Sequence, residues 1–216
     1  DWETEGSDRV SMHLPNDQDA LISAVAEANP NTVVVLNTGS PVEMPWIDEV
    51  PAVLQVWFPG QEFGDALAAV VFGDADPGGR LPTTFPRRYE DNPTLFTYPG
   101  ENGEVRYGES IFVGYRGYEH RALPVRYPFG FGLGYTTFDI GPPVLSVDTV
   151  TARSLAHHPV RVSVAVTNTG TRTGSEVVQV YVAPPPGPLA RPAQELKGFA
   201  KVTLAPGERG DVHLDD

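Results

Sequence analysis

A run of β-branched residues, TVVVLNTG at residues 32–39, constrains the fold of this chain more than any other feature. Its continuous apolar character from Thr32 to Leu36 predicts a strand that is buried on both faces, as in a parallel sheet. A second run of this kind, AVLQVW, extends from Ala52 to Trp57. Helical patterns flank the two runs, and this alternation of strands and helices predicts an α/β domain with a parallel sheet.

Two helices are predicted from apolar periodicity and from their end signals. The first lies in NDQDALISAVAEANP, which starts with a capping Asn16 or Asp17 and ends before Pro30. Its predicted apolar face consists of Leu21, Ile22, Val25 and Ala28. The second helix lies in GQEFGDALAAVVFGD, where Gly73 provides the stop. Its apolar positions are Leu67, Val70 and Val71.

From Pro143 onward the chain consists of short segments that alternate apolar and polar residues between glycine, proline and asparagine turns. In VRVSVAVTNTG, one face of the predicted strand carries Val160, Val162, Val164 and Val166. The opposite face carries Arg161, Ser163 and Ala165. This pattern predicts an immunoglobulin-like or fibronectin type III-like β-sandwich. Only four or five strands fit where about seven are usual, so we expect this domain to be partial.

Residues 92–142 join the two predicted domains and are rich in aromatic residues and glycine. A connection of this length is usually functional or disordered, and the many Tyr and Phe residues argue against disorder. We therefore expect an ordered connector that packs against both halves. The predicted organisation is an α/β domain at 1–91, this connector, and a fibronectin type III-like domain at 143–216.

The composition excludes several classes of function. The 216 residues carry a net charge of −13, whereas nucleic acids and anionic membranes bind basic surfaces. No apolar run approaches the roughly 20 residues of a membrane helix. The chain has no cysteine, so disulfides and thiolate metal sites are excluded, and we expect no cofactor or metal. It begins at Asp1 without a signal peptide, so the compartment stays open, and we expect both ends to be cut.

The stretch DWETEGSDR at the start of the chain is the main candidate for a chemical site. We expect it to follow a strand upstream of the chain, which would place its acids at the carboxyl edge of the sheet, where ligands bind. Two glutamates, Glu3 and Glu5, would suit general acid catalysis, which keeps one carboxyl protonated. Gly6 permits a sharp turn, and Asp8 could pair with Arg9. From spacing alone, a solvated acidic loop remains the favoured interpretation.

Other motifs are weaker candidates. GFGLG at residues 130–134 does not lie between a strand and a helix, so we discount a dinucleotide loop. GSP at residues 39–41 follows a strand and is a weak candidate for a substrate-facing loop. Three aromatic residues are expected to pack in the core or connector rather than bind sugars, namely Trp46, Trp57 and Phe58. The five histidines lack metal-like spacing: His13, His120, His157, His158 and His213.

Six segments in their order along nearly the whole chain resemble the carboxyl-terminal half of glycoside hydrolase family 3 β-glucosidases. The first three are WETEGSDR, LPNDQDALISAVAEANPNTVVVLNTGSPVEMPW and PAVLQVWFPGQEFGDALAAVVFGDADPGGRLPTTFP. The others are FVGYRGYE, YPFGFGLGYTTF and ELKGFAKVTLAPGE. The resemblance departs from the family pattern at Ser110, where glycine is usual, and at Gly134, where serine is common. It implies an α/β sandwich domain followed by a fibronectin type III-like domain, each of them partial in this chain: most of the first and the front of the second.

The resemblance also implies a mechanism for retaining hydrolysis of terminal β-D-glucosyl residues. A barrel domain amino-terminal to this chain would supply an aspartate nucleophile, and the glutamate of an EGxDR segment would be the acid/base. The matching residue here is Glu5, followed by Gly6, Asp8 and Arg9, while Glu3 is assigned only a supporting role. The two carboxyls of a retaining glycosidase lie about 5–5.5 Å apart, so Glu5 would have to reach the barrel.

Two alternatives remain open on the sequence. The chain could belong to a β-xylosidase or arabinosidase of the same family, because the barrel holds most of the sugar-binding residues. It could also be a non-catalytic, carbohydrate-associated structural module. The expected partners are a β-glucoside substrate and the barrel, in the same protein or a separate chain. Neither nucleic acid nor membrane is expected, and a homodimer is left open.

Overall fold

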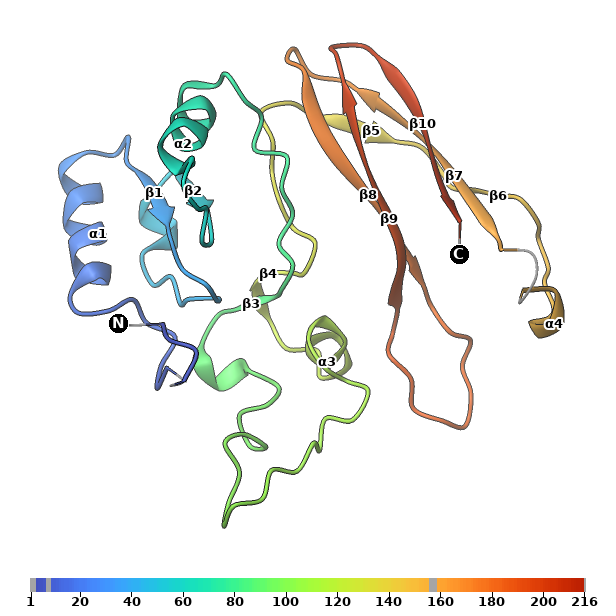
Figure 1. The fold of residues 1–216 in the computed structure, drawn as a ribbon, viewed down its shortest axis with the longest axis horizontal. Coiled ribbons are helices and arrows are strands. Elements are labelled where there is room, and N and C mark those ends of the chain that lie inside the picture. The colour runs from blue at the N-terminus through green and yellow to red at the C-terminus, as the bar shows by residue number, and fades with distance from the viewer. Residues whose placement is uncertain (1–2, 7–8, 156–158, 216) are drawn as a thin grey trace. The chain divides into compact units, whose positions relative to one another are not determined.

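The computed structural model describes residues 3–6, 9–155 and 159–215 (Figure 1). The chain forms two compact units, each of which is described by itself below. The first consists of Asp1–Asp65 and Thr83–Phe129, and the second of Ala66–Pro82 and Gly130–Asp216. The division thus falls inside α2 and inside the predicted connector. The domain boundaries at 91 and 142 stay predictions.

The first unit is an α/β unit built on two parallel strands, as the sequence predicts. β1 (Val33–Leu36) and β2 (Ala52–Gln55) pair in parallel, from Val33 opposite Ala52 to Leu36 opposite Gln55. A short antiparallel pair joins β3 to β4. The other elements of this unit, with the bounds of β3 and β4, are α1 (Gln18–Ala28), η1 (Ile47–Glu49), the start of α2 (Phe63–Phe72), β3 (Phe85–Pro86), η2 (Tyr89–Asp91), α3 (Tyr115–His120) and β4 (Val125–Tyr127).

The prediction that the first strand is buried on both faces is wrong for this chain. Val34 and Leu36 are 8% and 3% exposed, whereas Val33, the first residue of the strand, is 47% exposed. The strand therefore alternates buried and more open positions. In the described part of this unit the parallel sheet has only two strands, so each strand has an edge without a neighbouring strand.

Helix α1 begins after Asp17, one of the two predicted caps, but the predicted apolar face is not the buried one. Leu21 and Val25 are 61% and 44% exposed, whereas Ala26 is 6% exposed. The helix turns Asp19 inward, because its Oδ1 accepts a hydrogen bond of 2.7 Å from the Nε1–H of Trp46. A buried tryptophan needs a partner for its N–H, and this need decides which side of the helix faces the core.

The core of the first unit gathers around Trp46, which is 1% exposed. This confirms the prediction that Trp46 packs in the interior. Trp57 is half-buried and contacts Phe85 edge to face at 6.1 Å between ring centroids. The buried apolar residues of the unit are Met12, Leu14, Ala26, Val34, Leu36, Val42, Met44, Trp46, Phe85 and Tyr118.

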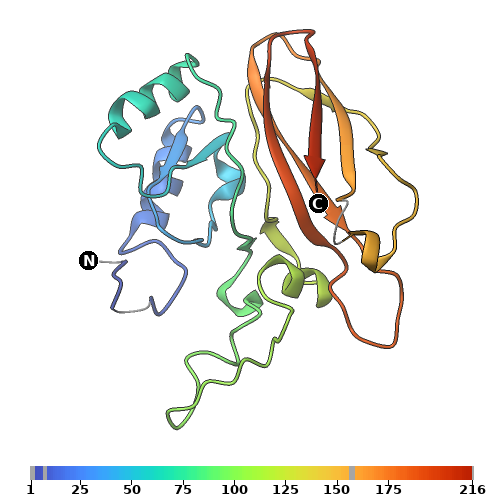
Figure 2. The same cartoon turned by 45° about the vertical axis from the view of Figure 1, so that its right-hand side comes forward.

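The second unit is a β-sandwich that also includes most of α2 and the loop after it (Figures 1 and 2). One sheet has the order β10–β7–β5, with β6 also paired to β7, and the other consists of β8 and β9. The fibronectin type III-like prediction is consistent with this architecture. The bounds are β5 (Phe138–Ile140), β6 (Val144–Leu145), α4 (Ala152–Leu155), β7 (Arg161–Asn168), β8 (Gly174–Val182), β9 (Glu195–Leu204) and β10 (Arg209–Asp215).

Strand β7 confirms the predicted alternation, because every second residue from Val162 to Asn168 is buried. The buried residues of the two sheets form one apolar core, with Val162, Val164, Val166, Val178, Leu204, Val212 and Leu214. Asn168 is fully buried at the end of the same face. Its Nδ2–H₂ donates to the carbonyls of Arg172 and Leu204 at 2.8 and 2.9 Å, while its Oδ1 accepts from Thr136 and Gly170.

The loop after α2 is tied to the sandwich by its own polar groups. Helix α2 ends at the predicted Gly73, which has a positive φ of 83° and donates to the carbonyl of Val70. The carboxylate of Asp76 accepts backbone N–H bonds from Tyr135 at 2.7 Å and Ser175 at 3.0 Å. These bonds explain why residues 66–82 group with the sandwich, although the sequence pattern assigned them to the α/β domain.

The two departures from the family pattern have local structural correlates. Ser110, where glycine is usual, has a φ of 51°, in the left-handed region that favours glycine. At Gly134, where serine is common, an added Cβ would lie 2.7 Å from Oδ1 of Asp76. The Asp76 carboxylate therefore occupies the space that a serine side chain would need.

Candidate active site

The candidate site lies at the carboxyl end of the parallel strands in the first unit. The loop after β1 carries Thr38, Gly39 and Ser40, and the segment after β2 carries Phe58. The amino-terminal stretch lies against the loop after β1, as the position of ligand sites in parallel sheets predicts. Glu5 and Gly6 lie in a turn, in agreement with the predicted role of the glycine.

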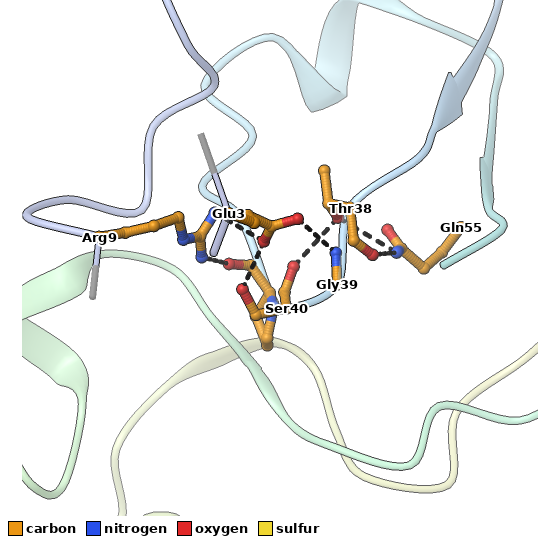
Figure 3. Close-up of polar contacts among 7 residues, drawn as sticks. Glu3, Arg9, Thr38, Gly39, Ser40 and Gln55 are labelled. Carbon is orange, nitrogen blue, oxygen red and sulfur yellow. Dashed lines mark hydrogen bonds and ion pairs between the residues drawn. The ribbon is translucent and has the colours of Figure 1, made fainter. Parts of the chain in front are cut away.

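Both carboxylate oxygens of Glu3 are occupied by groups of the loop after β1. Oε2 accepts the backbone N–H of Gly39 at 2.6 Å, and Oε1 accepts the hydroxyl of Ser40 at 2.8 Å. The side chain of Glu3 is only 18% exposed. Figure 3 shows this carboxylate between Arg9 and the Gly39–Ser40 backbone. Glu3 is therefore engaged in holding two chain segments together.

Arg9 fixes the other end of the same stretch. Its Nη2–H donates to the carbonyl of Pro41 at 2.6 Å, and its Nη1 lies 3.6 Å from Oε1 of Glu3. The Nη1 atom is buried and has no hydrogen-bond partner among the described residues. The predicted pairing of Arg9 with Asp8 lies outside the described residues. The observed ion pair instead joins Arg9 to Glu3.

The loop that receives Glu3 is itself held in place from β2. Gln55 at the end of β2 donates from Nε2 to the carbonyl of Thr38 at 3.0 Å and to its hydroxyl at 3.2 Å. The Thr38 hydroxyl donates to the carbonyl of Ser40 at 3.0 Å. An added Cβ on Gly39 would lie 2.6 Å from the ring of Phe58, so a larger residue here would have to displace that ring. The GSP segment is thus a rigid receiving loop.

Glu5 differs from Glu3 in its exposure and in its hydrogen bonds. Its side chain is exposed, and among the described residues it takes part in no hydrogen bond or ion pair. It lies on the wall of an open cavity of about 740 Å³. The other lining residues come from the same unit and include Glu3, Arg9, Ser40, Phe58, Thr84, Tyr89, Asn92, Tyr98 and Tyr118.

The walls of this cavity combine aromatic rings with polar groups, which is the composition of a small-molecule site. Phe58 is 69% exposed, so the prediction that it packs in the core is wrong. Tyr118 is 8% exposed, and burial together with the charge of Asp91 raises the pKa of its hydroxyl to about 12. Asp91 is buried beside it and forms an ion pair of 2.8 Å with Arg88. The Thr84 hydroxyl is buried without a partner among the described residues.

The discounted motifs lack the geometry of ligand sites. GFGLG lies in the loop between β4 and β5, not between a strand and a helix. His13 lies 3.8 Å from Asp19 and 3.7 Å from Glu43, and His213 bonds to Ser163. His157 and His158 lie outside the described residues. Within the described ranges, no three histidines or acids converge as metal ligands, and no helix has the length and apolarity to cross a membrane.

The sequence analysis found Glu3, Glu5 and Arg9 and named the GSP loop as a weak candidate, but it missed the other groups that surround them. Ser40 carried a usable signal, because GSP directly follows a predicted strand of a parallel sheet. Gln55, Phe58 and Tyr118 carried none, because their relation to Glu5 depends on how segments distant in sequence pack.

Comparison with known proteins assigns the chain to a family. The model of the glycosyl hydrolase family 3 C-terminal domain matches residues 1–135, and that of the fibronectin type III-like domain matches residues 176–215. The chain is therefore a member of glycosyl hydrolase family 3 and contains the C-terminal domain of that family.

Its relatives are named β-glucosidases. A β-glucosidase of Rhizobium radiobacter is 54% identical over 99% of this chain, and a probable β-glucosidase I of Emericella nidulans is 48% identical over 99%. The chain spans about a quarter of the length of these relatives, 26% in each case. The crystal structure of a β-glucosidase from Kluyveromyces marxianus in complex with glucose superimposes with a TM-score of 0.91 at 46% identity. It matches 99% of this chain and 25% of its own.

Proposed function

We propose that this chain supplies the acid/base carboxylate, Glu5, of a retaining β-glucosidase. The nucleophile would come from an amino-terminal barrel domain in the same protein or in a separate chain. The observation that carries the proposal is the contrast between the two glutamates of the opening stretch. Glu3 is bound by two donors and a cation, whereas Glu5 lies exposed on the cavity wall. Of these two glutamates, Glu5 is the one whose carboxylate the described residues leave available to exchange a proton with a substrate.

The chemistry requires such a group. In the first step of retaining hydrolysis the acid/base protonates the departing glycosidic oxygen while the nucleophile attacks the anomeric carbon. In the second step the same carboxylate removes a proton from water, which releases the sugar with its original configuration. A glucoside is favoured over a xyloside or arabinoside, because the similar proteins are named β-glucosidases and one was crystallised with glucose.

The test is Glu5→Ala in the enzyme that joins this chain to its barrel. Hydrolysis of substrates with poor leaving groups should fall by about 100-fold or more, because general acid catalysis contributes roughly 10²–10⁴-fold. Activated phenyl glucosides should still react in the first step, since their phenolates leave without protonation. The second step should then become limiting, and azide should restore turnover and give the β-glycosyl azide.

Glu3→Ala is the matched control, two residues away on the same stretch. It should lose less activity and show no azide rescue, because Glu5 still occupies the space that azide needs. Azide rescue of Glu3→Ala but not of Glu5→Ala would overturn the assignment. Equal loss on all substrates in Glu5→Ala would favour a non-catalytic structural module. The 216-residue chain alone should not hydrolyse an aryl β-glucoside, since one carboxyl cannot carry out both displacements.

A further inference from the structure

We infer that Glu3 is a positioning residue that fixes the acid/base turn on the loop after β1, and that Ser40 and Arg9 act with it. This inference rests on the proposed role of Glu5. It assigns a function to contacts that a merely solvated acidic loop would not form.

The first step of the argument is the number and placement of the bonds. Glu3 lies two residues before Glu5, and both of its oxygens are held, by Gly39 N–H at 2.6 Å and Ser40 Oγ at 2.8 Å. Arg9, four residues after Glu5, donates to the carbonyl of Pro41 at 2.6 Å. The turn that carries Glu5 is thus fastened on both sides to a loop of three consecutive residues, and these contacts we call the Glu3 clamp.

The second step is the rigidity of the receiving loop. Gln55 bonds both to the carbonyl and to the hydroxyl of Thr38, directly before Gly39. The ring of Phe58 lies over Gly39, where an added Cβ would come within 2.6 Å of the ring in its present position. The position of the Gly39 N–H is therefore set by β2 and the segment after it, as Figure 3 shows for Gln55. The Glu3 clamp therefore holds the turn that carries Glu5 at a defined place relative to this loop.

The third step concerns catalysis. A carboxyl that must protonate one oxygen and later accept a proton from water works only within hydrogen-bond reach of both. A displacement of about 1 Å in such a group can cost about 100-fold in rate. Glu5 makes no bond of its own to described residues, so its position depends on the backbone of its turn. The clamp supplies that restraint without using the Glu5 carboxylate.

The test uses Glu3→Gln and Ser40→Ala, singly and together, in the enzyme with its barrel. Glu3→Gln keeps the size of the side chain but removes one acceptor and the charge that faces Arg9. We expect kcat/KM for a glucoside with a poor leaving group to fall about 10-fold or more, and that for a dinitrophenyl glucoside to fall much less. Ser40→Ala should give a smaller loss with the same selectivity. The double variant should lose less than the product of the two, because both changes break one contact.

Glu27→Gln on the exposed side of α1 is the matched control and should leave both substrates unchanged. A loss that is equal for both substrates, accompanied by a lower melting temperature, would show that the contacts only stabilise the fold and would overturn the inference. Unchanged kinetics in Glu3→Gln would overturn it as well. Suppose that Glu5→Ala shows azide rescue while Glu3→Gln leaves the ratio of the kcat/KM values for the two substrates unchanged. The inference about the Glu3 clamp is then overturned, and the proposed role of Glu5 stands. If Glu5→Ala shows no rescue, the proposed function fails first.

Discussion

The two units of this chain differ in how closely burial follows the local sequence pattern. In β7 the three valines Val162, Val164 and Val166 are buried, the residues between them are more open, and the buried positions continue to the polar Asn168. In α1 the apolar face chosen by periodicity is largely exposed, with Leu21 at 61%. A strand in a sandwich has one face toward the opposite sheet, so its period of two settles burial. A short helix on a small sheet can rotate, and its partners decide which side is covered.

The two units also differ in how a polar side chain is accommodated at the core. Asp19 in the first unit is half-buried and Asn168 in the second is fully buried, and each makes specific hydrogen bonds. In the sandwich the polar residue follows the apolar pattern and ends it. In the α/β unit, Asp19 faces the buried Trp46, and residues of the predicted apolar face of α1, such as Leu21, are exposed. Substitutions that separate these effects test the comparison.

The largest effect is expected for Trp46→Ala in the first unit. Truncation of a fully buried tryptophan typically costs about 3–5 kcal/mol, and here it also leaves the Asp19 carboxylate without its donor. Urea unfolding followed by circular dichroism measures the loss. The half-buried Trp57→Ala is the control and should cost less. Equal losses at the two positions would mean that Trp46 does not anchor α1.

Asn168→Ala should destabilise the sandwich by about 2–4 kcal/mol, because it leaves buried groups such as the Leu204 carbonyl without partners. The neighbouring Thr169 is exposed, and Thr169→Ala should change the free energy of unfolding by about 0.5 kcal/mol or less. Tryptophan fluorescence reports on the first unit, because all three tryptophans precede residue 66. A change in that signal with Asn168→Ala would show that the two units unfold together.

A pair of glutamine substitutions on α1 tests which side of the helix is buried. Ala26→Gln should cost about 1–3 kcal/mol, because the core around Ala26 has no room for a longer polar side chain. Val25→Gln, one residue away and 44% exposed, should cost about 0.5 kcal/mol or less. Thermal unfolding of the 216-residue chain measures both. A larger loss of stability for Val25→Gln than for Ala26→Gln would show that the face predicted from periodicity is the buried one.

The smallest effect at neutral pH is expected for Tyr118. Burial raises the pKa of its hydroxyl to about 12 from an ordinary value of 10. Below pH 10 both folded and unfolded states keep the phenolic proton, so the hydroxyl adds no pH dependence. Between pH 10 and 12 the unfolded state releases the proton first, and stability falls as pH rises. Tyr118→Phe should remove this part of the decrease. Parallel curves for the two proteins from pH 9 to 12 would contradict the assigned shift.

The sequence alone determined the class of both folds, the end of α2 before Gly73 and the alternation of β7. These features follow from local rules. The period of two in a strand, the glycine that ends a helix and the order of strands and helices are each set by residues close together in the sequence. It also identified Glu3, Glu5 and Arg9 as candidate residues, through acidic clustering and resemblance to one family.

Only the tertiary structure decided which of these residues is held and which is exposed. The sequence places Glu3 and Glu5 two positions apart with the same side chain, and nothing local separates them. Glu3 is fixed because the loop after β1 presents an N–H and a hydroxyl at the same place. The inward rotation of α1, the exposure of Phe58 and the attachment of residues 66–82 to the sandwich arise in the same way. Each depends on contacts between segments far apart in the sequence, whose geometry no local pattern encodes.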